Sequence, residues 1–117
     1  MLKPNKLANK NFLSSLDIST EEIVHILDLA KKFKNKELNI KFENKVLGLI
    51  FDKSSTRTRV SFQVAMSRLS GTTIDLNPTT SQIGRGELIK DTARVLSGYC
   101  DVIAIRTFNQ EDLEEYA

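Results

Sequence analysis

Hydroxyl and guanidinium side chains stand directly after the longest apolar segment of the sequence. The apolar segment is 46–51, and the polar stretch that follows it contains Ser55, Thr56, Arg57 and Thr58. Hydroxyl groups donate hydrogen bonds to oxyanions, and the planar fork of an arginine can grip two oxygens of one anion. At a helix N-terminus, free backbone N–H groups and the positive end of the helix dipole add to this attraction. The stretch therefore predicts an anion-binding site.

A simpler interpretation of the same stretch is that Ser54 or Ser55 only caps a helix and that the arginines are solvated. The stretch is not a Walker A loop, because the spacing G-x-x-x-x-G-K-[ST] is absent. It is not a dinucleotide fingerprint either, since no glycine occurs between residues 49 and 70. Two arginines, at 57 and 59, together with several hydroxyl groups exceed what capping needs, and this favours the anion site.

Other polar candidates follow later in the chain. Arg106 stands at the end of the apolar stretch 102–105, where it could face the same site or simply be a surface arginine. Gln82 and Arg85 lie in the loop 77–86, which could reach a ligand or a neighbouring subunit, or be an ordinary flexible loop. Glu87 and Asp91 are interpreted as acids that favour a helix N-terminus.

The single histidine and the single cysteine limit the remaining chemistry. One cysteine excludes an intramolecular disulfide and fits a reducing compartment, and one histidine excludes a His-rich metal site. His25 falls beside the apolar face of the first predicted helix, so we interpret it as a surface or half-buried residue. Cys100 precedes a predicted strand and is expected to be a small packing residue rather than a nucleophile.

Alternating helical and extended patterns must position these residues. Ser19 and Glu22 form a capping box that predicts the start of a helix, preceded by a polar arm. The further elements predicted are a strand at 46–51, a helix at 56–70 stopped by Gly71, a strand at 72–76, a helix at 87–98, a buried strand at 102–105, and a helix from 110 onward. This order, α then β-α-β-α-β-α, predicts an α/β fold with a parallel sheet flanked by helices. Ligands of such sheets bind at the carboxyl ends of the strands, which places segments 52–59, 77–87 and 106–109 together.

Composition sets the broad class. The chain has 117 residues, 40% of them hydrophobic, so it forms one domain at most. Its net charge of +2 argues against a nucleic-acid partner. No apolar run approaches the length of a membrane span, and the first residues carry no apolar signal core. We therefore expect a soluble, cytoplasmic chain without a membrane partner.

Three motifs in order resemble the aspartate/ornithine carbamoyltransferase family. They are Phe51-x-Lys53-x-Ser55-Thr56-Arg57-Thr58-Arg59-x-Ser61-Phe62, then Gln82-Ile83-Gly84-Arg85-Gly86-Glu87 with Lys90-Asp91-Thr92-Ala93-Arg94-Val95-Leu96, then Asp101-Val102-Ile103-Ala104-Ile105-Arg106-Thr107-Phe108. Phe51-x-Lys53 and Arg106-Thr107-Phe108 are similar to the ornithine branch. The resemblance implies that residues 1–117 are an N-terminal carbamoyl-phosphate-binding domain, truncated before its end.

The resemblance also implies residue roles. Ser55, Thr56, Arg57 and Thr58 would bind the phosphate of carbamoyl phosphate, with Thr58 also near its carbonyl oxygen. Arg106 would bind phosphate and carbonyl oxygens together, which makes Arg57 and Arg106 the implied catalytic residues. Gln82 would reach the site of the adjacent subunit in a homotrimer. The implied reaction is attack of the ornithine δ-amine on the carbonyl carbon, giving citrulline and phosphate, with no metal or organic cofactor.

The sequence departs from the family pattern in its length. It lacks the His-Pro-x-Gln segment and the ornithine domain with its His-Cys-Leu-Pro motif, and neither His25 nor Cys100 replaces them. We therefore expect an inactive fragment that supplies the phosphate-binding half of the site. The residues present do not by themselves select the amine acceptor, so ornithine, aspartate, acetylornithine and putrescine all stay open. A non-catalytic anion-binding or assembly module is the alternative of another class.

Overall fold

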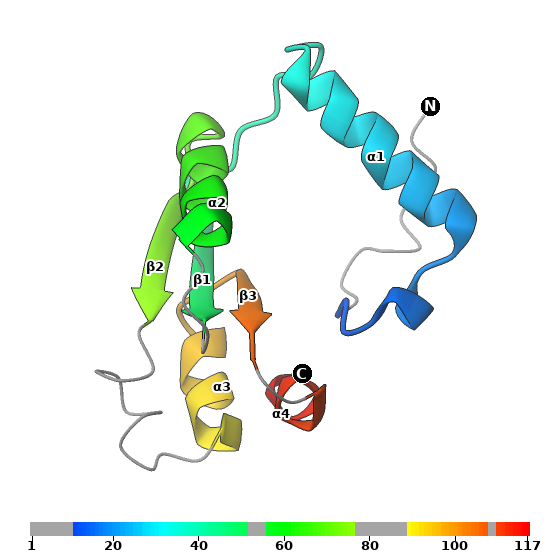
Figure 1. The fold of residues 1–117 in the computed structure, drawn as a ribbon. Helices are drawn as coiled ribbons and strands as arrows, with labels where there is room; N and C mark the ends of the chain where they lie inside the picture. The colour runs from blue at the N-terminus through cyan, green and yellow to red at the C-terminus, as the bar shows by residue number, and fades with distance from the viewer. Residues whose placement is uncertain (1–10, 52–55, 77–88, 108–109) are drawn as a thin grey trace. The chain divides into compact units, whose positions relative to one another are not determined.

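The computed structural model describes residues 11–51, 56–76, 89–107 and 110–117 (Figure 1). These residues belong to two compact units. The first contains the N-terminal part up to Asn39 together with Ala117, and the second is Ile40–Tyr116. All three strands, and the helices that cover them, lie in the second unit.

The first unit contains a short 3-10 helix, Ser15–Asp17, and the helix α1, Thr20–Lys34. The predicted capping box is confirmed. The Glu22 N–H donates to Ser19 Oγ at 3.1 Å, and the Ser19 N–H donates to Glu22 Oε1 at 2.9 Å. The short helix before it begins with a second capping box, between Ser14 and Asp17, and lies within the segment predicted as a polar arm.

The second unit is built on a parallel sheet of β1 (Val46–Phe51), β2 (Thr72–Leu76) and β3 (Val102–Arg106). The strand order is β2-β1-β3, so the most apolar strand is central. All residues of β1 after its first are buried. The predicted parallel α/β fold is therefore confirmed. The prediction of a buried strand at 102–105 is wrong. Val102 is 62% exposed and residues 103–105 are only half-buried, because β3 has only β1 as a neighbour among the described strands.

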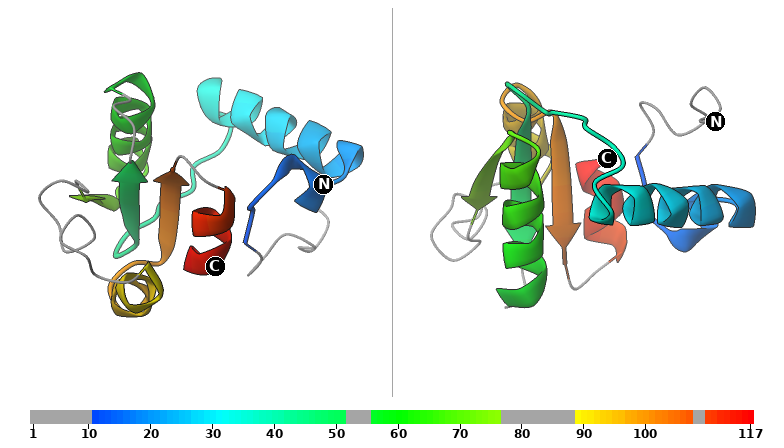
Figure 2. Two further views of the ribbon diagram at one scale, coloured as in Figure 1. Left: turned by 60° about the horizontal axis from the view of Figure 1, so that its bottom comes forward. Right: turned by 90° about the horizontal axis from the view of Figure 1, so that it is seen from above.

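Three helices accompany the sheet, namely α2 (Thr56–Arg68), α3 (Ile89–Ser97) and α4 (Gln110–Tyr116). From β1 the chain passes to β2 on one side and then crosses back to β3 on the other side. Right-handed crossovers in opposite directions put their helices on opposite faces. Figure 2 shows this arrangement, with α2 on one face of the sheet and α3 on the other. The last helix, α4, contacts α3.

One face of β1 carries the packed core. Leu47, Leu49 and Phe51 alternate along the strand and form a buried cluster, against which Met66 of α2 and Ala104 of β3 pack. Successive residues of a strand face opposite sides, so these three side chains share the side that α2 covers. The core thereby fixes where α2 lies over the end of β1.

The end of α2 differs from the sequence prediction in its details. The helix ends at Arg68, and the left-handed residue that closes it is Ser70, with φ 65°, rather than the predicted stop Gly71. The Gly71 N–H donates to the carbonyl oxygen of Met66 at 2.8 Å. A Cβ at 71 would overlap only the flexible end of the Met66 side chain, which can move aside.

The opposite, amino edge of the sheet is held by Asp101. Its Oδ2 accepts a hydrogen bond from the Val46 N–H at 2.8 Å, and its own N–H donates to the Val46 carbonyl at 2.9 Å. Lys45 Nζ lies 3.8 Å from Asp101 Oδ1. This carboxylate therefore ties the start of β1 to the start of β3.

Candidate functional site

The central and third strands end side by side. In the parallel register of β1 and β3, Phe51 is the partner of Arg106, and both are the last residues of their strands. After these ends the chain diverges, because α2 covers one face while α4 lies with α3 on the other. Open α/β sheets bind ligands outside the carboxyl ends of the strands at such a point of divergence.

The first turn of α2 stands at this position. Thr56, Arg57 and Thr58 are its first three residues, and all three side chains are exposed. The first N–H groups of a helix have no partner within it and carry the positive end of the dipole. Every other α-helix of the described chain has an acidic residue in its first turn, whereas α2 has none. No carboxylate in this turn therefore competes with an external anion.

Arg106 completes the part of the candidate site that the structure describes. Its side chain is exposed at the end of β3, and Thr107 after it is half-buried. Two of the predicted segments thus meet at the carboxyl edge, the one after β1 and the one after β3. The predicted site residues Ser55 and Gln82 lie outside the described residues, as do Glu87 and the whole predicted loop 77–86 with Arg85.

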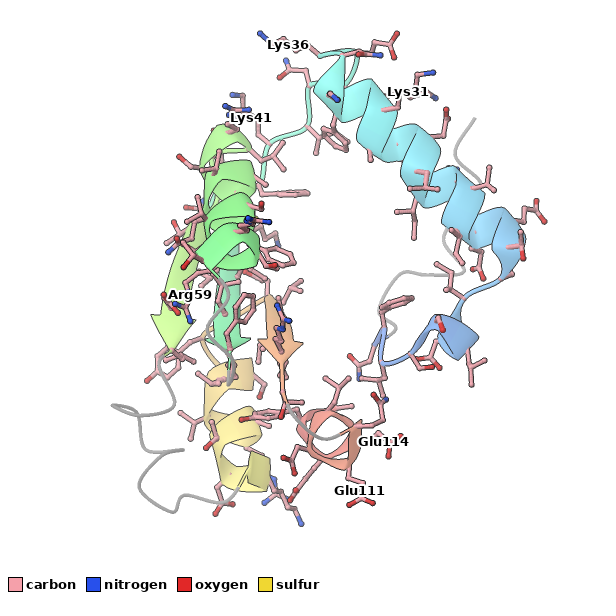
Figure 3. All side chains as sticks on the ribbon, viewed as in Figure 1. Lys31, Lys36, Lys41, Arg59, Glu111 and Glu114 are labelled. Carbon is pink, nitrogen blue, oxygen red and sulfur yellow. The ribbon has the colours of Figure 1, made fainter. Side chains whose placement is uncertain are left out.

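Arg59, the second arginine of the motif, takes a different position. Its Nε atom is buried 3.2 Å from Asp75 Oδ2, and its guanidinium carbon lies 5.5 Å from the centre of the Phe51 ring (Figure 3). Phe51 also meets Phe62 edge to face, with ring centres 6.3 Å apart. Arg59 therefore links the first turn of α2 to β1 and β2. This link was not predicted from the sequence, where its one signal was a lone acid, Asp75, in an otherwise uncharged strand.

Cys100 and His25 lie elsewhere. Cys100 is half-buried just before β3 and lies beside Gly48 of β1. A Cβ built on Gly48 would lie 3.0 Å from the Cys100 Sγ. Burial raises the pKa of the Cys100 thiol, and the Asp101 carboxylate raises it further. A thiol kept protonated at the amino edge fits the packing role expected from the sequence. His25 is a half-buried residue of α1.

The described residues offer neither a metal cluster nor a membrane helix. Nowhere in these ranges do three His, Cys, Asp or Glu side chains gather as ligands for a metal ion. Among the helices that the structure describes, none combines the length and apolar character needed to cross a membrane.

Fold and site together define a class of protein. The sheet is parallel, the helix after its central strand begins without an acid, and the neighbouring strand ends in an arginine. This combination is typical of proteins that bind a phosphate-bearing small molecule. Comparison with known families agrees, since residues 10–117 match the aspartate/ornithine carbamoyltransferase family in its carbamoyl-P binding domain. The chain belongs to this family.

Similar proteins support the same assignment. An ornithine carbamoyltransferase of Prochlorococcus marinus subsp. pastoris is 86% identical over all 117 residues, and one from Prochlorococcus marinus strain MIT 9312 is 81% identical over the same length. In both cases the match covers 38% of the relative. The chain thus spans a little over a third of the length of the curated relatives it matches.

Solved structures share the fold. Ornithine carbamoyltransferase from Pyrococcus furiosus is 46% identical with a TM-score of 0.84, over 94% of this chain and 36% of that one. Aspartate transcarbamoylase from Trypanosoma cruzi, in complex with carbamoyl aspartate and phosphate, is 31% identical with a TM-score of 0.81. That match covers 99% of this chain and 38% of the other.

Proposed function

We propose that this chain is the carbamoyl-phosphate-binding domain of an ornithine carbamoyltransferase. The intact gene product would transfer the carbamoyl group of carbamoyl phosphate to the δ-amine of ornithine. The observation that carries the proposal is the pairing of Phe51 with Arg106, which sets an arginine at the end of the strand next to β1, the strand that precedes the acid-free first turn of α2. The identities of 86% and 81% to ornithine carbamoyltransferases favour ornithine over aspartate as the acceptor.

The proposed roles follow from charge and position. The N–H groups and hydroxyls at Ser55, Thr56 and Thr58, with the guanidinium of Arg57, would bind the phosphate. Arg106, from the neighbouring strand, would contact phosphate and carbonyl oxygens together. Both Arg57 and Arg106 are exposed to solvent in this chain.

The reaction proposed for the intact enzyme is acyl transfer to nitrogen. The amine lone pair attacks the carbonyl carbon, and the bond from that carbon to the phosphate oxygen breaks. Phosphate leaves with the bonding electrons, and the nitrogen loses a proton. Donors fixed around the carbonyl oxygen and the leaving phosphate stabilise the charge that develops at both, which is the largest source of rate in most such sites.

Two further statements belong to the proposal. The isolated chain would bind carbamoyl phosphate without turnover, because its matches cover only 38% of the relatives' length. The intact enzyme would be a cytoplasmic homotrimer in which Gln82 reaches the adjacent subunit. Sedimentation of the intact gene product tests the trimer. Mixing an inactive active-site variant with a Gln82→Ala variant tests sharing, since mixed trimers with restored activity require it.

Titration calorimetry tests the site directly. Carbamoyl phosphate should release heat on binding to the chain, and inorganic phosphate should compete with it. The intact gene product should form citrulline from ornithine much faster than it carbamoylates aspartate, acetylornithine or putrescine. Absence of carbamoyl-phosphate binding by both proteins would refute the proposal, and a preference for another amine would refute only the acceptor.

A further inference from the structure

The contact between Arg59 and Asp75 joins the phosphate-binding turn to the sheet. Arg59 is the fourth residue of α2, directly after the exposed turn Thr56–Thr58. Its Nε lies 3.2 Å from Asp75 Oδ2 on β2. The side chains are 28% and 35% exposed, respectively, so solvent reaches this ion pair only in part.

The aromatic ring beneath this arginine supplies a second attachment. Phe51 is 4% exposed, and the Arg59 guanidinium carbon lies 5.5 Å from its ring centre. A cation over an aromatic face is attracted by the ring quadrupole, and more strongly where water is partly excluded. Arg59 is thus held by a carboxylate from β2 and by a ring from β1.

The same geometry directs Arg59 toward β2. Asp75 is one residue before the end of β2, where it pairs with Leu49 in the interior of β1 rather than with a strand end. An arginine directed at this carboxylate already has a negatively charged partner. Arg57, two residues earlier on the helix, has an exposed side chain and can reach an incoming phosphate. The two arginines of the motif therefore have different surroundings: Arg59 is paired with a carboxylate, and Arg57 is exposed to solvent.

We propose that Arg59, through its ion pair with Asp75 and its stacking on Phe51, is a positioning residue that holds the first turn of α2 in its anion-binding geometry. This inference rests on the proposed carbamoyl-phosphate site and adds to it a role for a carboxylate on a neighbouring strand. Small displacements of a group that grips a substrate are costly, because binding donors act only when their geometry is kept.

The variant Asp75→Asn in the intact gene product separates this role from direct binding. If Arg59 positions the turn, removing its partner weakens the affinity for carbamoyl phosphate and inorganic phosphate by about three- to tenfold. The KM for carbamoyl phosphate should rise while the KM for the amine stays unchanged. If Arg59 itself binds the anion, Asp75→Asn frees it, and an unchanged or tighter affinity would overturn the proposal.

Asp101→Asn is the matched control. It removes the charge of another partly exposed, ion-paired aspartate, but at the amino edge of the sheet. It should lower thermal stability and leave phosphate affinity within about twofold of the unchanged protein. An equal loss of affinity in both variants would show a general effect of destabilisation and would overturn the positioning role.

The double variant Arg59→Met with Asp75→Asn tests whether the two residues act as a unit. Its loss of affinity should be no greater than that of Arg59→Met alone, because residues acting through one contact are not additive. Additive losses would contradict the proposal.

Amide hydrogen exchange supplies a readout that needs no ligand. In Asp75→Asn, exchange at residues 60–63, the first amides bonded within α2, should accelerate relative to the rest of the helix, whereas Asp101→Asn should leave this difference unchanged. Unaltered exchange in Asp75→Asn would overturn the positioning role even if the protein bound no phosphate. Lack of phosphate binding together with the predicted exchange change would refute only the proposed function.

Discussion

Phe51, the last residue of β1, is paired in register with Arg106, the last residue of β3. Neighbouring strands lie about 4.8 Å apart, so this pairing places the backbone of Arg106 one strand away from the end of β1. The ring of Phe51 is buried beneath Arg59, while Arg106 is exposed. Phe51 therefore packs in the core next to the candidate site, whereas Arg106 is exposed to solvent.

Arg57→Ala should weaken carbamoyl-phosphate binding by the intact gene product on the order of 100-fold, because a charge-assisted, two-point contact is lost. Titration calorimetry measures this directly. Arg68→Ala is the control, since Arg68 is an exposed arginine at the other end of the same helix. Equal affinity in Arg57→Ala and the unchanged protein would remove Arg57 from the site.

Arg106→Lys should retain more carbamoyl-phosphate affinity than Arg106→Met but less than the unchanged protein. A lysine keeps the positive charge and loses the planar fork that engages two oxygens. Steady-state KM values of the three proteins give the order. If lysine and methionine were equally damaging, geometry rather than charge would dominate at this position. Full affinity in Arg106→Met would exclude the residue.

Leu49→Ala should lower the free energy of unfolding of the chain by about 2–5 kcal/mol, because this side chain has no exposed surface and sits in the central strand. Urea denaturation followed by circular dichroism measures the loss. Val102→Ala on β3, where the side chain is 62% exposed, should cost about 0.5 kcal/mol or less. Similar losses at both positions would contradict the burial of β1.

Ser70→Gly should raise the free energy of unfolding by about 1 kcal/mol, because Ser70 has a φ of 65° and glycine adopts this conformation without a Cβ clash. The same change at Ser67, inside α2, should lower stability by roughly 0.5–1 kcal/mol. Urea midpoints of the two variants should therefore move in opposite directions. A decrease in both would show that Ser70 is not left-handed in solution.

Cys100 should react slowly with iodoacetamide near pH 8, because burial and the Asp101 carboxylate raise its pKa and leave little thiolate. Unfolding in urea should restore the rate of an ordinary cysteine. The unfolded thiol ionises at a lower pH than the folded one, so the contribution of Cys100 to stability should fall as the pH rises above about 8.5. A rate in the folded chain above that in urea would contradict the raised pKa.

The sequence by itself determined the elements and their order. The capping box at Ser19, the apolar run 46–51 and the alternation of patterns predicted α1, β1 and a parallel sheet, because capping and periodicity are local properties of the chain. The family resemblance was likewise carried by local motifs. The gathering of polar residues at strand ends followed from the general rule for parallel sheets.

Only the tertiary structure decided which strands are neighbours and which of the two arginines of the motif pairs with a carboxylate of the sheet. The order β2-β1-β3 puts Arg106, rather than the end of β2, beside Phe51 on one side of the central strand. Arg57 and Arg59 look alike in the sequence, but Arg59 meets Asp75 because β2 pairs with β1 on the other side. Ser70 likewise takes the left-handed turn that a glycine was expected to fill. The strand order and the partner of Arg59 depend on contacts between segments distant along the chain, which local patterns do not encode.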